Sequence, residues 1–167
     1  MGWNDFYQRR DIADAVLRRA ARDPRAPLPF AEIPGAVEAF GTEEQLLLAL
    51  HYRWSQLLGG HLRTEFEDAT DHVDAVTRAW RETVRKHRTL RAVLDANVDR
   101  YPALRQVHEA EQRMLAVAAG LAEPGEPVEE ITKVGAAFTG LLRHGPDIEA
   151  PRRNPIGQLL RMLAPSA

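Results

Sequence analysis

Residues 42–58 read TEEQLLLALHYRWSQLL, and this stretch decides the fold class. Its apolar residues recur at helical spacing and are dense enough to bury most of a helix circumference. Thr42 with Gln45 forms the pattern of a capping box. Glu43 and Glu44 come next, where the positive end of a helix favours acidic side chains. The stretch therefore predicts a largely buried helix that begins after Thr42.

Working outward, the rest of the chain has the same helical periodicity and no sustained period-two alternation of a strand. Gly59-Gly60 weakens the central helix, although Leu62 and Phe66 continue its apolar face. The four prolines between residues 24 and 41 leave room for at most a single turn at 34–40. Further helices are predicted over residues 4–22, 71–88 with a short continuation capped by Thr89, 102–121, 127–145 and 155–163.

These patterns predict an all-α, single-domain bundle of about five to seven helices over residues 1–167. Residues 1–41 form an N-terminal helix plus a proline-rich segment, 42–145 the main bundle, and 146–167 a loop and a short helix. The buried stripes are predicted from apolar spacing alone. In the first helix the stripe is Phe6, Ile12, Ala13, Val16, Leu17 and Ala20, and in helix 102–121 it is Ala103, Val107, Ala110, Met114, Val117 and Leu121.

Bulk composition excludes several classes of function. The chain of 167 residues has no cysteine, which excludes disulfides, thiolate catalysis and cysteine-bound metal sites. Its net charge is −2 and no segment forms a strong basic stripe, so we expect no nucleic-acid binding by this chain alone. The start MGWNDFYQRR is no signal peptide, and no apolar run is long enough to span a membrane. We expect a cytoplasmic protein.

No catalytic motif is present. Neither of the two serines lies in a Gly-x-Ser-x-Gly elbow, and no glycine-rich phosphate loop and no His-Glu-x-x-His occurs. The sequence therefore predicts a protein that is not an enzyme and carries no cofactor.

Histidines supply the alternative interpretation, a metal- or haem-binding bundle. His61, Glu65 and His72 would share one face of an unbroken helix together with Asp68, enough ligands for a transition metal. The stretch 68–71, however, has the pattern of a helix break, which would scatter them. His87 is the other candidate, because it follows two apolar residues on one face and its pKa is easily shifted.

Aromatic side chains suggest where a small apolar ligand would bind. Trp54 and Trp80 are able to line a cavity between helices, as aromatic residues often do, and we place Phe66 and His87 beside them. The competing interpretation is that the two tryptophans are ordinary core residues.

Three stretches resemble tetracycline-repressor-type transcriptional regulators. Residues 40–49, FGTEEQLLLA, resemble the junction at which that family's long fourth helix begins. Residues 11–16, DIADAV, are similar to its first helix, and residues 30–37, FAEIPGAV, to its second. The resemblance implies a small-ligand-binding, dimerising protein. It departs from the family before Phe40, where four prolines replace the DNA-reading helix, so that unit is expected to be degenerate or missing.

Helix 127–145 is predicted to mediate self-association. Glycines inside a helix each cost about 1 kcal/mol relative to alanine, so a closely packed neighbour should offset that cost. The neighbour is either helix 102–121 of the same chain or a second copy across a two-fold axis. For the second case we predict a homodimer interface, helped by residues 156–163, made of Gly135, Phe138, Gly140, Leu141 and Leu142.

Overall fold

The structure is a computed structural model, and it describes residues 2–145. Within these residues the chain forms seven helices and no strand, which confirms the all-α class. The predicted helix over 155–163 lies outside the described residues. The helices are α1 Trp3–Ala20, α2 Ala36–Phe40, α3 Glu43–Phe66, α4 His72–Lys86, α5 Arg88–Asn97, α6 Pro102–Ala118 and α7 Val128–His144.

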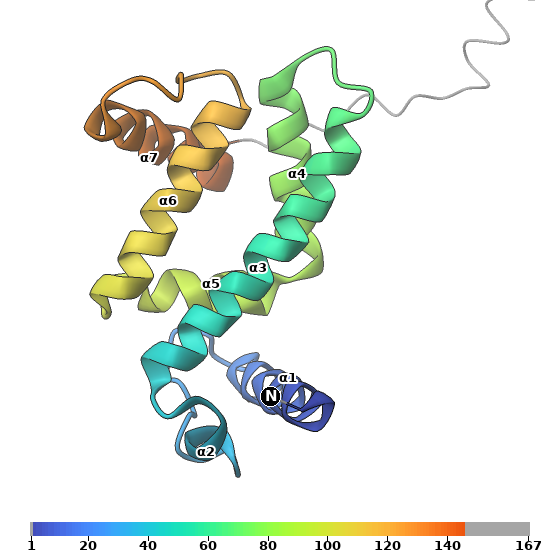
Figure 1. Cartoon of the computed structure of the whole chain (residues 1–167), viewed down its shortest axis with the longest axis vertical. Coiled ribbons are helices and arrows are strands. Elements are labelled where there is room, and N and C mark those ends of the chain that lie inside the picture. The colour runs from blue at the N-terminus through green and yellow to red at the C-terminus, as the bar shows by residue number, and fades with distance from the viewer. Residues whose placement is uncertain (1, 146–167) are drawn as a thin grey trace, which may run out of the picture.

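The long helix α3 organises the molecule (Figure 1). Helix α4 packs along it, α5 crosses beneath it, and α6 and α7 form a hairpin on the far side. Helices α1 and α2 lie at the end of the molecule where α3 begins, and α1 packs on α2 and α5. Helix α3 therefore contacts α2, α4, α5 and α6.

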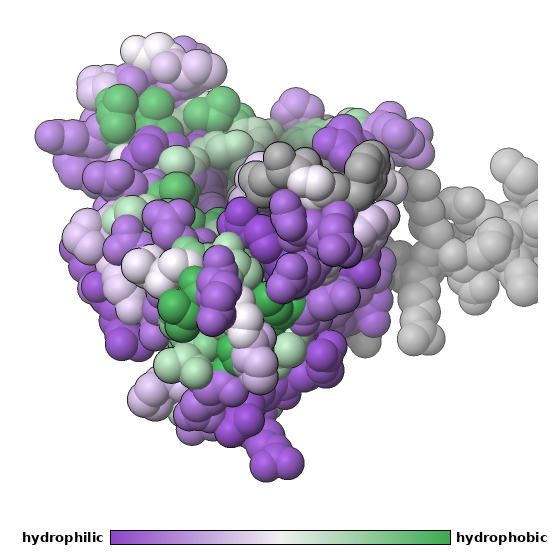
Figure 2. Space-filling view, turned by 60° about the horizontal axis from the view of Figure 1, so that its bottom comes forward, coloured by the Kyte–Doolittle hydropathy of each residue, from purple (hydrophilic) through white to green (hydrophobic). Residues whose placement is uncertain are grey.

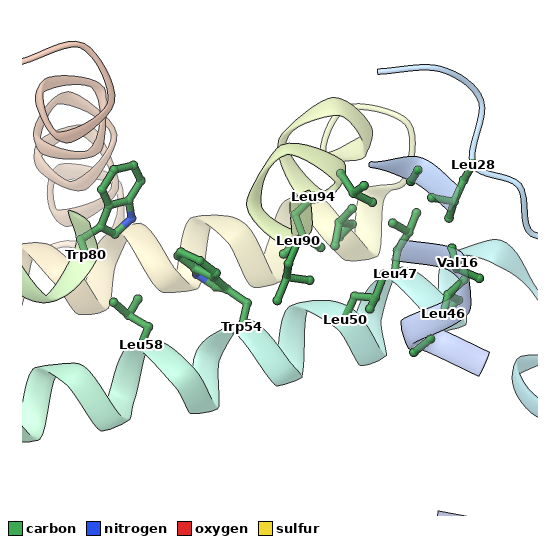
Figure 3. Packing of buried hydrophobic residues seen from close by; sticks show 14 of the residues in the cluster. Val16, Leu28, Leu46, Leu47, Leu50, Trp54, Leu58, Trp80, Leu90 and Leu94 are labelled. Carbon is green, nitrogen blue, oxygen red and sulfur yellow. The ribbon is translucent and has the colours of Figure 1, made fainter. Parts of the chain in front are cut away.

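The core follows the apolar face predicted for the central helix. Leu46, Leu47 and Leu50 are buried near the start of α3, and Trp54 and Leu58 continue the buried row. Figure 3 shows this row facing side chains from α1, α4 and α5. Burying a leucine or tryptophan of this kind contributes roughly 1.5–3 kcal/mol each, so α3 accounts for much of the apolar stabilisation.

The predicted starts of three helices are confirmed. The Thr42 hydroxyl accepts a hydrogen bond from the Gln45 N–H at 3.2 Å, and α3 begins at the next residue. The Asp71 carboxylate accepts from the Asp74 N–H at 3.0 Å and caps α4. Pro102 is the first residue of α6. Gly59 and Gly60, in contrast, lie inside an unbroken α3.

The junction between α4 and α5 differs from the prediction by one residue. Helix α5 begins at Arg88, so Thr89 lies inside it and does not cap it. His87 is the junction residue, and its N–H donates to the Thr83 carbonyl at 2.9 Å. The break arises because His87 leaves the helical region of backbone conformation, with φ −128° and ψ 45°.

The rotation of α6 is the largest error in the predicted core. The residues that it buries are Leu104, His108, Glu111, Leu115 and Ala116. Met114 and Leu121, from the predicted stripe, are exposed by 41% and 44%. The buried face of α6 is thus shifted by about one residue, or roughly 100° around the helix axis, from the predicted and more apolar face. Polar partners on other helices explain this rotation, as described below.

Helix α7 packs closely on α6 of the same chain. A Cβ on Gly135 would lie 2.5 Å from the Gln112 carbonyl oxygen, so only glycine permits this approach. Phe138 and Leu142 are buried on the same side, whereas Val128 and Leu141 are exposed. The close neighbour expected for the glycines is therefore α6, at least for Gly135.

Candidate functional site

An apolar groove of about 730 Å³ lies between α1 and the first half of α3. In the space-filling view of the end that carries α1 and α2, hydrophobic side chains lie exposed among hydrophilic groups (Figure 2). The groove is lined by Gly2, Phe6, Arg9, Arg10, Ala13, Phe40, Ala49, Leu50, Tyr52, Arg53 and Gln56.

Helical spacing places these side chains in two facing rows. On α1, Phe6, Arg9 or Arg10 and Ala13 follow each other at three- and four-residue steps, so they share one face. Tyr52 projects from α3 on the other side. Phe6 was predicted to be a core residue, but its side chain is 62% exposed, and Tyr52 is 67% exposed. Two large aromatic rings therefore stand uncovered at the groove.

Among the described residues, three arginines and no carboxylate line the groove. The guanidinium of Arg9 stacks over the Phe40 ring with 4.8 Å to the ring centroid. Arg10 forms an ion pair with Asp11 at 3.3 Å, and Arg53 pairs with Asp14 across to α1. Arg9 differs from both, because it has no hydrogen bond or ion pair with any described residue.

A buried cluster of charged groups lies elsewhere on α3, where the helix faces α5 and α6. Its centre is Arg91 of α5, which is only 4% exposed. The Arg91 guanidinium lies over the Trp54 ring, 4.9 Å from the centroid, and donates to the Glu111 carboxylate at 3.0 Å. Its Nε also donates to the Asp95 carboxylate at 3.0 Å. Burial of an arginine is affordable here because two carboxylates and an aromatic face surround it.

The second oxygen of Glu111 faces His51 of α3. The His51 Nε2 and Glu111 Oε2 atoms are 3.3 Å apart, an ion-pair distance, but their geometry is not that of a hydrogen bond. Burial opposes the charged form of Glu111, but His51 and Arg91 outweigh it and hold the pKa of that carboxyl below its ordinary value. Glu111 therefore remains ionised inside the protein.

His108 of α6 completes the cluster. Burial, followed by the nearby Arg91 guanidinium, lowers the pKa of His108 below its ordinary value. Its ring nitrogens lie 3.5 Å from Nη2 of Arg91 and 3.4 Å from Nη2 of Arg143, which itself bonds to Asp95 at 2.7 Å. This cluster joins four helices, α3, α5, α6 and α7. Its role is therefore structural, because it holds these helices together.

The four residues predicted to line a ligand pocket lie in different surroundings. Trp54 is fully buried and carries Arg91 on its ring. Trp80 is also a core residue, and its edge lines a second pocket of about 590 Å³ between α4 and the end of α7. Phe66 meets His72 edge-on with ring centroids 5.3 Å apart. His87 lies at the α4–α5 junction, where burial lowers its pKa.

The alternative metal site is not formed in the part of the chain that the structure describes. Within residues 2–145 no group of three or more His, Asp or Glu side chains could hold a metal ion. Glu65 instead forms an ion pair with Arg78 at 2.8 Å, and His72 packs on the Phe66 ring. The break between α3 and α4 separates His61 and Glu65 from His72, as the pattern of residues 68–71 predicted.

Residues predicted for a dimer interface divide between two faces of α7. Gly135, Phe138 and Leu142 face the interior of the same chain. A Cβ on Gly140 would meet no atom of the described residues within 4 Å, and Leu141 is 68% exposed. Those two residues lie on the outer face, where a second copy would have access. The contribution expected from 156–163 lies outside the described residues.

Sequence reasoning missed Arg91, His108, Glu111 and the groove. The available signal was a second stripe on α6 at positions 104, 108, 111 and 115, with the same spacing as the one chosen.

No protein-family model, curated protein or solved structure matches the chain. Among the described helices, none has the length and apolar character needed to cross a membrane. The geometry alone therefore carries the functional proposal.

Proposed function

We propose that this chain is a non-catalytic helical protein that binds a small apolar ligand in the groove between α1 and α3. The observation that carries the proposal is the exposure of two large aromatic side chains, Phe6 and Tyr52, at an apolar groove of about 730 Å³. Ligand sites typically have volumes of roughly 300–1,000 Å³ and mostly apolar walls with a few polar groups.

The proposed ligand site differs from the one expected at Trp54, Phe66, Trp80 and His87. The groove supports binding better because its aromatic side chains are accessible, whereas both tryptophans are committed to the core. The resemblance to tetracycline-repressor-type regulators is in keeping with a ligand-binding role, and kinship with that family stays a proposal. The absence of DNA binding and the cytoplasmic location stay predictions.

A neutral fluorescent probe tests this function without bringing a charge of its own. N-phenyl-1-naphthylamine should gain fluorescence on binding to the full chain. Phe6→Ser should weaken the affinity about tenfold, because the ligand loses contact with most of one aromatic side chain. Met114→Ser is the control, since Met114 is also an exposed apolar residue but lies on α6 and does not line the groove. Equal weakening by both variants, or no binding at all, would refute the groove as the site.

Self-association is a second candidate function, favoured by one observation. Leu141 is 68% exposed on α7, and a Cβ on the adjacent Gly140 would meet no described atom within 4 Å. We propose a homodimer through this face. Sedimentation equilibrium at micromolar concentration should give twice the monomer mass, and Gly140→Arg should give a monomer. A monomeric wild-type chain would disprove the dimer.

A further inference from the structure

We infer that the groove binds an amphipathic carboxylate, with Arg9 as the residue that receives the carboxylate group. This inference rests on the proposed function and adds the chemical class of the ligand. It depends on the charge of the lining and on the state of one arginine.

The lining attracts anions. Arg9, Arg10 and Arg53 each bring a positive charge to the groove, and none of the described residues that line it is acidic. The carboxylates that neutralise Arg10 and Arg53 are Asp11 and Asp14, and neither of them lines the groove. Arg9 therefore leaves at the groove one positive charge that no described carboxylate neutralises, and this charge is complementary to a negative group.

Arg9 is the one arginine of the three without an acceptor in the described chain. It is half-buried, its guanidinium is fixed over the Phe40 ring at 4.8 Å, and none of its donors meets a carboxylate or carbonyl. A planar guanidinium presents donors that match both oxygens of a carboxylate. Stacking on Phe40 already restricts the side chain, so less conformational entropy is lost when the anion binds.

The remaining lining fits an alkyl body. From Gly2 to Ala13 the groove follows α1 for eleven residue steps, or roughly 16 Å at the helical rise. Apolar carbon from Phe6, Ala13 and Phe40 lines this length, and Leu50 and Ala49 line it from α3. A hollow of this shape suits a single extended chain, whereas a membrane surface would need a protruding face.

Competition between two ligands of equal length tests the inference. Dodecanoate and dodecanol, each below its aggregation concentration, are titrated against the naphthylamine probe bound to the full chain. Dodecanoate should displace the probe at about tenfold lower concentration, the effect of one charge-assisted hydrogen-bonded pair. Arg9→Gln should abolish that preference and leave dodecanol unchanged. Arg18→Gln, an exposed arginine of the same helix without a partner among the described residues, should keep it.

The outcomes separate the two proposals. Equal displacement by dodecanoate and dodecanol overturns the carboxylate but leaves the apolar site intact. Absence of probe binding removes the proposed function itself. A preference that survives Arg9→Gln also overturns the assignment. Co-sedimentation with phosphatidylglycerol vesicles, combined with no response to monomeric dodecanoate, would identify a lipid surface as the anion source and contradict the free ligand.

Discussion

Two arginines in this protein stack on aromatic rings at nearly the same distance, yet their surroundings differ. Arg91 lies 4.9 Å from the Trp54 ring centroid and Arg9 lies 4.8 Å from that of Phe40. Arg91 is buried and bonds to Glu111 and Asp95, whereas Arg9 is half-buried and has no acceptor among the residues that the structure describes. Both arginines thus stack on a ring, but within the described chain only Arg91 also bonds to carboxylates.

The difference shows how a charged side chain serves structure in one place and recognition in another. A buried arginine must find its partners within the chain, because an unpaired charge in the interior is very costly. An arginine at an open groove has water as an alternative partner, so its donors stay available to a ligand. Substitutions should therefore destabilise the protein at the Arg91 cluster and change binding at Arg9.

The largest expected effect comes from breaking the buried cluster. Glu111→Ala removes a carboxylate from Arg91 and the anion facing His51. We expect the free energy of unfolding, measured by urea denaturation, to fall by about 3 kcal/mol. This is the lower end of the usual range for a broken buried pair, because Asp95 still accepts from Arg91.

Glu109→Ala is the control for that measurement, because Glu109 is on the same helix and forms no ion pair with a described residue. It should change the free energy of unfolding by no more than about 0.5 kcal/mol. Equal losses for the two variants would show that the cluster does not stabilise the fold.

An intermediate effect is expected on acidification. The folded-state pKa of His108 is lowered, first by burial and then by Arg91, so its neutral form stabilises the fold. That contribution is complete above the ordinary histidine pKa near 6.5 and is lost as the pH falls through the lower folded-state value. One such group changes stability by at most about 1.4 kcal/mol per pH unit. The charged groups around it are Arg91, Glu111, Arg143 and Asp95.

Urea denaturation at about pH 7.5 and about pH 5.5 measures this dependence. Stability should be lower at the acidic pH, and His108→Gln should reduce the difference between the two. A residual dependence of the same sign should remain, because burial also lowers the pKa of His87. An unchanged difference in the variant would exclude His108 as its source.

The smallest effect on stability is expected at the groove. Arg9→Gln removes the stacking on Phe40 but breaks no hydrogen bond or ion pair within the described chain. We expect a loss of about 0.5–1 kcal/mol in the free energy of unfolding. A loss as large as that of Glu111→Ala would mean that Arg9 is structural, and the contrast between the two arginines would disappear.

The fold was predictable where one helix face is much more apolar than the others. The dense leucines of 46–58 admit only a buried helix, and Thr42 and Asp71 cap as their types suggest. On α6, two stripes have the same spacing, and the one with more apolar residues is not the buried one. The choice depends on Arg91 and His51, which approach Glu111 only in the folded chain. Local sequence does not contain that information.

The groove was hidden for a similar reason. Phe6 fits the apolar stripe of α1 together with Ile12 and Val16, and nothing in the spacing separates it from them. In the structure Ile12 and Val16 are buried, whereas Phe6 is 62% exposed. Whether an apolar residue meets a neighbour depends on where the next helix lies, which periodicity does not determine.

The manner in which α1 is attached has a consequence for the motion of the molecule. Helix α1 packs on α2 and α5, whereas α3 packs on these two helices and also on α4 and α6, so α1 is the wall of the groove with fewer neighbouring helices. The ion pair between Arg53 and Asp14 bridges the two walls directly. We expect α1 to open locally at a lower free energy than that of global unfolding. A molecule bound between the two walls would hold α1 against α3. It would slow amide hydrogen exchange more along α1 than along any other helix.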